Sequence, residues 1–214
     1  MAGEYALRIG RLDEATEWYL EAARSAEGDA GLAERATRIS LMGTDNARVG
    51  EALELWRRAA PWSPAMGAAQ ATLALRENRL RSAGRELERL LRAPDPDGWR
   101  YAVAALGSGG KDPKAAAKVL GRVVDSGAVP DDLQVWLVLG GLAQRLGDVA
   151  LTERIVGDVI EQFPDEPRVA LLRASQLREA DKPDEAREVL AALVDDETMG
   201  PDLRLSIAAE YDAL

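Results

Sequence analysis

Apolar side chains recur at helical intervals along most of the chain. From 135 to 148 they fall three or four residues apart, the spacing that places side chains on one face of a helix. A Gly140–Gly141 pair interrupts this stretch. Each interior glycine costs a helix about 1 kcal/mol relative to alanine, so the pair indicates that packing or binding favours the absence of a side chain there.

A small residue also recurs along the chain, after a turn signal and before a large apolar residue. The six positions are Ala15, Ala52, Ala83, Ala116, Thr152 and Ala186, separated by 37, 31, 33, 36 and 34 residues, about 34 on average. Four residues further along stand Tyr19, Trp56, Leu87, Leu120, Val156 and Leu190. A small residue followed by a large one on the same face is typical of the second helix of a helical hairpin.

The segments upstream of these positions predict the first helices of the same hairpins. They cover 30–42, 64–77, 97–106, 131–146 and 166–180. Proline follows several of the second helices, as in "RRAAPWSP" and "IEQFPDEP", and proline ends a helix. The sequence therefore predicts an all-α protein of about thirteen helices in antiparallel pairs, with no stretch left for a sheet.

The period and the helix–turn–helix unit resemble the tetratricopeptide repeat (TPR). Residues 136–164 match its signature best, with Trp136, Leu139, Gly140 and Pro164 at the family's positions. The resemblance implies a right-handed superhelical α-solenoid of about six repeats. It also implies that Gly140 lies where the two helices of a hairpin approach most closely, whereas the next glycine faces a groove.

In this register the whole chain is one solenoid domain, 1–214. The repeats cover approximately 1–28, 30–63, 64–95, 97–129, 131–165 and 166–199, and a partial terminal helix covers 201–214. In this register the first helix of the first repeat begins before residue 1, with only its last turns around "EYALRI" present, and the partner of the terminal helix should follow the last residue. We therefore expect a piece of a longer array, truncated at both ends.

The N-terminal run "GRLDEATEWYLEAARSAEGDAGLAERATRIS" is similar to the opening repeats of bacterial TPR lipoproteins of the outer membrane. Members of that group are adaptors that recruit a periplasmic carboxyl-terminal processing protease to cell-wall-cleaving enzymes. The resemblance implies a non-enzymatic periplasmic adaptor, anchored to the outer membrane through a segment outside this chain. Two alternatives stay open: a cytosolic TPR scaffold or assembly factor with a different protein partner, and a ligand-binding helical enzyme.

The amino-acid composition excludes several classes of catalytic and metal-binding site. The chain has no cysteine and no histidine, which removes disulfides, thiol nucleophiles, the common zinc sites and imidazole catalysis. We therefore expect no catalytic residue, no metal site and no cofactor.

The net charge of −10 is divided as −1 over residues 1–100 and −9 over 101–214, which disfavours nucleic acid as a partner. No apolar run reaches the roughly 18 residues of a membrane span, so no membrane contact by this chain is expected.

The remaining motifs have structural interpretations. The stretch "GSGGKD" (107–112) has Ala105 and Asp112 where a phosphate-binding loop needs glycine and a hydroxyl residue, so it predicts a turn. Acidic clusters at 131–133, 164–167, 183–186 and 195–197 stand at helix ends, where carboxylates cap amides. The arginines of 76–92 indicate a solvated face or a contact with an acidic partner rather than with nucleic acid. Of the tryptophans, Trp56 and Trp136 are expected in the core, Trp62 and Trp99 near helix starts are expected to be partly exposed, and Trp18 neighbours a repeat column.

In TPR proteins the first helices line the inner surface of the superhelix, where peptides or partner helices bind. In this register the predicted groove residues are Thr37, Leu41, Thr72, Arg76, Tyr101, Leu137, Gln144, Arg145, Leu171, Ser175 and Arg178. The two asparagines, Asn46 and Asn78, fall in turns, which disfavours a clamp for a terminal carboxylate. The mixed apolar and hydroxyl lining favours an extended segment or an amphipathic helix as the partner.

Overall fold

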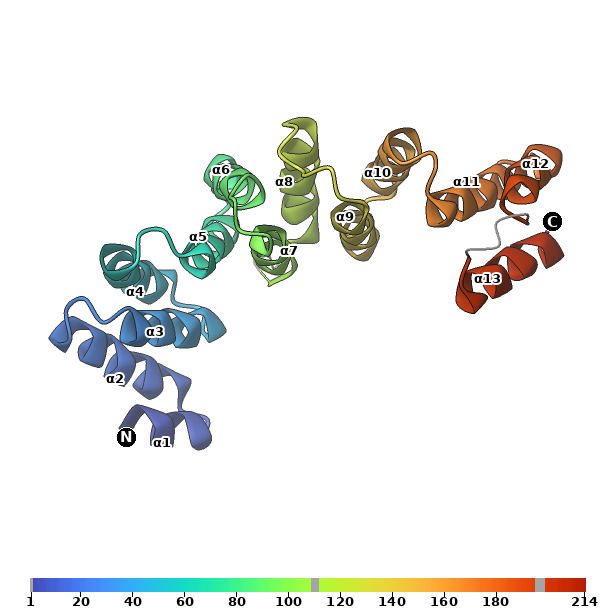
Figure 1. The fold of residues 1–214 in the computed structure, drawn as a ribbon. Helices are drawn as coiled ribbons and strands as arrows, with labels where there is room; N and C mark the ends of the chain where they lie inside the picture. Colours follow the sequence, from blue (N-terminus) through green and yellow to red (C-terminus); the bar gives the residue numbers. More distant parts are fainter. Residues whose placement is uncertain (1, 109–111, 195–198) are drawn as a thin grey trace. The chain divides into compact units, whose positions relative to one another are not determined.

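The chain is all-α, as the periodicity predicts. A computed structural model describes residues 2–108, 112–194 and 199–214, and over these ranges it contains thirteen helices and no strand (Figure 1). The helices are α1 (Ala2–Arg8), α2 (Leu12–Ser25), α3 (Ala30–Met42), α4 (Asn46–Ala59), α5 (Pro64–Arg76), α6 (Leu80–Leu91), α7 (Gly98–Ser108), α8 (Pro113–Asp125), α9 (Leu133–Arg145), α10 (Val149–Gln162), α11 (Pro167–Glu179), α12 (Pro183–Val194) and α13 (Pro201–Asp212). Among the described residues, no helix has the length and apolarity needed to cross a bilayer.

The helices begin where capping chemistry is available. The carboxylates of Asp29, Asp45 and Asp112 accept hydrogen bonds from backbone amides at the starts of α3, α4 and α8. Each carboxylate satisfies amides that have no partner within the helix. Proline occupies the first turn of α5, where its missing N–H costs nothing, and the hydroxyl of Ser63 caps the same helix.

One turn geometry closes four of the hairpins. Gly10, Asn78, Gly147 and Asp181 all have left-handed backbone angles, with φ between 55° and 76°. At each of them the turn residue's amide bonds three residues back and the next amide five residues back, as in Asn78 to Leu75 and Arg79 to Ala74. This pattern ends a helix and reverses the chain. The four positions are 68, 69 and 34 residues apart, which is twice, twice and once the period of the sequence pattern.

The described contacts group into two compact units. The first contains residues 1–131 with 141–148, and the second contains 132–140 with 149–214. In the first unit α1 packs on α2, α3 on α4 and α5 on α6, and helices two apart also touch, as α5 does with α7 and α6 with α8 (Figure 1). In the second, α11 packs on α12 and both contact α13. The assignment of one solenoid domain to 1–214 stays a prediction.

The recurring small residues lie in the core. Five of the six positions, Ala15, Ala52, Ala83, Ala116 and Ala186, are at most 1% exposed. The sixth, Thr152, is only half-buried, and α10 buries Leu151, Ile155 and Val159 instead. Threonine is larger than alanine and carries a hydroxyl that needs a partner, so the buried face of α10 is centred on these apolar side chains.

The two glycines of α9 are placed differently. A β-carbon added at Gly140 would lie 3.4 Å from Cγ2 of Ile155 in α10, whereas one at Gly141 would meet only Nη1 of Arg145, at 3.8 Å. The prediction that Gly140 faces its partner helix is therefore confirmed.

The four tryptophans with a predicted environment divide as expected, and Trp18, for which the register makes no prediction, is exposed. Trp56 and Trp136 are buried, at 2% and 6% exposure, and Trp18 and Trp62 are 51% and 86% exposed. Trp99 is half-buried beneath the guanidinium of Arg100.

Candidate functional site

The predicted groove residues fall in both units. Thr37, Leu41, Thr72, Arg76, Tyr101, Gln144 and Arg145 belong to the first unit, and Leu137, Leu171, Ser175 and Arg178 belong to the second. Their side chains divide into three groups: buried, engaged in bonds between helices, and accessible.

Two of the predicted residues do not face solvent. Thr37 is fully buried and Thr72 is 6% exposed. The hydroxyl of Thr37 donates to the carbonyl of Ala33, one turn earlier in the same helix, at 2.8 Å. A hydroxyl satisfied by its own helix, as in Thr37, can occupy a core position. Because both side chains are buried, the assignment of Thr37 and Thr72 to a partner-binding surface is corrected: both pack in the core.

Arg76 links two neighbouring hairpins. From the end of α5 its guanidinium donates to the carbonyl of Gly43, with Nη1 to O at 3.0 Å, and also to the carbonyl of Leu41. Both acceptors lie at the end of α3, where carbonyls have no partner within the helix and the helix dipole is negative. Arg76 therefore caps α3 from outside, and its guanidinium is already occupied.

Arg178 makes a similar link within the second unit. Its Nε lies 2.8 Å from Oε1 of Glu210 in α13, and its Nη2 is 3.4 Å from the hydroxyl of Ser175. The hydrogen bond to Glu210 raises the pKa of Arg178 above its usual value, with the charge of Glu210 acting in the same direction. The pair therefore joins α11 to α13.

The other predicted residues are accessible to different degrees. Gln144 and Arg145 at the end of α9 are exposed, and Leu137 is 37% exposed. Leu41, Tyr101, Leu171 and Ser175 are half-buried. Gln144 and Arg145, which belong to the same unit, therefore offer the clearest accessible pair in the predicted set.

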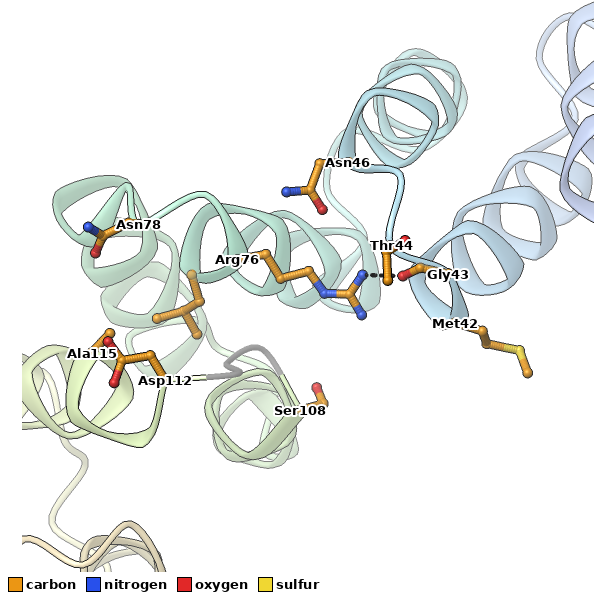
Figure 2. Close-up of a pocket in the computed structure, with 10 residues that line it drawn as sticks. Met42, Gly43, Thr44, Asn46, Arg76, Asn78, Ser108, Asp112 and Ala115 are labelled. Carbon is orange, nitrogen blue, oxygen red and sulfur yellow. Dashed lines mark hydrogen bonds between the residues drawn. The ribbon is translucent and has the colours of Figure 1, made fainter. Parts of the chain in front are cut away.

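A cavity that sequence reasoning missed lies at the hairpin turns of the first unit. It has a volume of about 490 Å³ and is lined by the ends of α3, α5 and α7 and by the starts of α4 and α8. Figure 2 shows its residues, with the guanidinium of Arg76 directed toward Gly43. The lining comprises Met42, Gly43, Thr44, Asn46, Leu75, Arg76, Asn78, Ser108, Asp112 and Ala115. The two asparagines, although far apart in sequence, thus line one cavity.

Three of the polar side chains that line this cavity form hydrogen bonds with the backbone of the protein itself. Asp112 caps α8, Arg76 caps α3, and the hydroxyl of Ser108 donates to the carbonyl of Ala104. Within the described ranges, no group of three acidic side chains is placed to hold a metal ion. Residues 109–111 of the "GSGGKD" stretch and the acidic cluster at 195–197 lie outside the described residues.

Ion pairs connect the helices of the N-terminal region. Glu4 of α1 accepts from the hydroxyl of Tyr19 and pairs with Arg35 of α3, with Nη2 to Oε1 at 2.8 Å. The Tyr19 hydrogen bond is the main cause of a lowered pKa for Glu4, and the charge of Arg35 adds to it. Arg24 of α2 pairs with Glu51 of α4, with Nε to Oε1 at 2.6 Å, and this bond lowers the pKa of Glu51.

No protein-family model matches the chain, and neither does any curated protein. The accessible surfaces of the two units are therefore interpreted from their own geometry.

Proposed function

We propose that the chain is a TPR-type α-solenoid and acts as a non-enzymatic protein–protein interaction scaffold or adaptor. The observation that carries the proposal is the left-handed turn at Gly10, Asn78, Gly147 and Asp181, which recurs at multiples of the 34-residue period. Repeats of this kind bury little core alone and present one surface per hairpin, which suits them to binding other proteins.

The accessible first-helix residues give the proposal a surface. Gln144 and Arg145 offer hydrogen bonds and charge, and Tyr101 offers a partly accessible ring on the same unit. Such a mixture fits an extended peptide segment or an amphipathic helix. We include neither cofactor nor nucleic acid in the proposed activity, since the chain lacks histidine and cysteine and carries a net charge of −10.

The more specific form of the proposal is an adaptor that recruits a protease or cell-envelope enzyme in a bacterium. It rests on the resemblance of the N-terminal run to bacterial TPR lipoproteins. The coding sequence upstream in the parent gene tests it. A lipobox cysteine there supports placement in the periplasm, and a cytosolic start overturns this form in favour of a cytosolic scaffold.

Affinity capture from a bacterial lysate tests the scaffold function. The wild-type chain is compared with Gln144→Ala/Arg145→Ala and with a control, Arg57→Ala/Arg58→Ala, on the exposed side of α4. We expect a partner that is retained by the wild type and the control and at least about tenfold less by the Gln144/Arg145 variant, as for an interface hot spot. Equal retention by all three proteins would exclude this surface.

A further inference from the structure

A hollow with a basic rim lies between α6 and α8 in the first unit. Its volume is about 490 Å³, and Leu80, Arg81, Gly84, Arg85, Glu88 and Arg122 line it. The two helices pack against each other (Figure 1). The hollow is thus formed by second helices, and it contains none of the residues of the predicted groove.

The three arginines that line the hollow form no ion pair among the described residues, although Glu88 also lines it. Among the described residues, no acidic side chain forms an ion pair with Arg81, Arg85 or Arg122, and Arg85 reaches only the hydroxyl of Ser82, at 3.4 Å. The nearby carboxylate of Glu88 pairs instead with Arg92, at 3.5 Å. In a chain with ten more acidic than basic side chains, three unpaired guanidinium groups around one hollow form a local positive field, which attracts an anionic partner.

The positive charge is specific to this part of the repeat array. Two residues after the recurring alanine, the sequence has Glu17 in α2 and Glu54 in α4, but Arg85 in α6 and Lys118 in α8. The same helical position therefore changes sign between the first two second helices and the next two. Lys118 is exposed one turn before Arg122 on α8, so the basic surface continues along that helix.

The floor of the hollow is apolar and open. Gly84 is buried at the bottom of the hollow, and a β-carbon added there would meet no atom within 4 Å outside its chain neighbours and its own helix backbone. The preceding turn of α6 contributes Leu80. In α4 the residue in the same register is Leu53, which is buried in the core. The replacement of leucine by glycine leaves room for an apolar side chain from outside, between the arginines.

We propose that this hollow docks an acidic segment of a protein partner, with carboxylates on Arg81, Arg85 and Arg122 and an apolar side chain seated over Gly84. Guanidinium groups bind carboxylates through charge-assisted, often bidentate hydrogen bonds. An apolar floor inside a charged rim is the usual arrangement of a protein interface. The inference rests on the proposed scaffold function, because both require a protein partner. It differs in placing that partner on α6 and α8, the second helices of their hairpins, and not on the predicted groove of the first helices.

The test uses a fluorescent acidic amphipathic peptide composed of glutamate, alanine and leucine, with fluorescence anisotropy at low salt as the readout. A peptide with glutamine in place of every glutamate serves as the ligand control. We expect binding of the acidic peptide that weakens with added salt, and binding at least about tenfold weaker for the glutamine peptide.

Two variants locate the site. Arg81→Gln/Arg122→Gln should weaken binding of the acidic peptide at least about tenfold, whereas the matched variant Arg57→Gln/Arg58→Gln, which changes the net charge equally, should bind as the wild type does. Gly84→Leu should also weaken binding with no loss of melting temperature, because its side chain fills open space. Equal binding by both double variants, or no binding of the acidic peptide to the wild type, overturns the proposal. Capture through Gln144 and Arg145 does not depend on either result.

Discussion

The α2–α4 pair and the α6–α8 pair are built from the same kind of helix but use their arginines differently. Between α2 and α4, Arg24 pairs with Glu51, and Arg48 lies 3.8 Å from Glu17. Between α6 and α8, Arg85 and Arg122 have no described acidic partner. The first pair therefore satisfies its charges internally, and the second leaves them available to another molecule.

Under the proposed docking, a set of similar helices acquires a binding surface without changing its fold. The buried alanines at positions 15, 52, 83 and 116 maintain the helix packing in both pairs. Exposed positions on the same helices are free of that constraint, because surface substitutions cost little stability. Under the proposal, the change from glutamate to arginine or lysine at one such position gives the α6–α8 pair its attraction for an anionic partner.

The largest expected change in the free energy of unfolding distinguishes a closely packed glycine, Gly98 at the start of α7, from a glycine with space around it, Gly84 in α6. A β-carbon at Gly98 would overlap the backbone carbonyl of Leu90, whereas one at Gly84 meets open space. Gly98→Ala should therefore lower the free energy of unfolding by about 1–3 kcal/mol, as overpacking does. Gly84→Ala should raise it by up to about 1 kcal/mol. Urea denaturation measures both, and equal effects would contradict the open hollow.

A smaller effect extends this distinction to α9. Gly140→Leu should cost more than about 1 kcal/mol, because its side chain would extend into Ile155, which is fully buried. Gly141→Ala should be tolerated. If thermal unfolding shows the same melting temperature for both variants, the close approach of α9 and α10 at Gly140 is wrong.

Acid should destabilise the N-terminal region by way of its ion pairs. The pKa values of Glu4, Glu51 and Glu54 are lowered in the folded chain, chiefly by hydrogen bonds from Tyr19, Arg24 and Arg57 respectively. A lowered folded pKa contributes stability that is present above the unfolded pKa, about 4.3, and is lost as the pH falls through the folded value. Urea midpoints from neutral pH to pH 3 should therefore fall, and less steeply in Glu51→Gln. An unchanged slope in that variant would exclude the pair from the acid response.

The smallest effect compares single arginines of the two regions. Arg24→Gln removes the ion pair with Glu51, whose side chains are each 44% exposed, and the longer pair with Glu17 at 3.6 Å. It should therefore lower the free energy of unfolding slightly, and less at high salt. Arg81→Gln removes no ion pair and should leave the free energy of unfolding unchanged within error. A larger loss of unfolding free energy for Arg81→Gln than for Arg24→Gln would contradict the conclusion that Arg24, and not Arg81, forms a stabilising ion pair.

The helices were predictable because their signals are local. The predicted segments 30–42 and 64–77 correspond to Ala30–Met42 and Pro64–Arg76, since caps and prolines define their ends. The burial of α10 was not predictable from the period alone. Thr152 occupies the alanine position, and the adjacent Leu151 and Ile155 compete for burial by their apolar area.

The site was less predictable because the reach of a side chain is not a local property. Register alone places Arg76 and Arg178 on an accessible face, but their long side chains extend to Gly43 and Glu210 on neighbouring helices. The hollow at Gly84 was not visible either, although the arginines of 76–92 suggested an acidic partner. Only the packing of α6 on α8 brings Arg122 to the same place.

Amide NMR of the labelled protein, titrated with the acidic peptide, tests the central claim most directly. Because the α2–α4 pair and the α6–α8 pair belong to the same unit, each pair serves as the control for the other. The account predicts chemical-shift changes at Arg81, Gly84, Arg85 and Arg122, with the amides around Arg24 and Glu51 unchanged. Changes of equal size in both regions, or confined to α2 and α4, would contradict it.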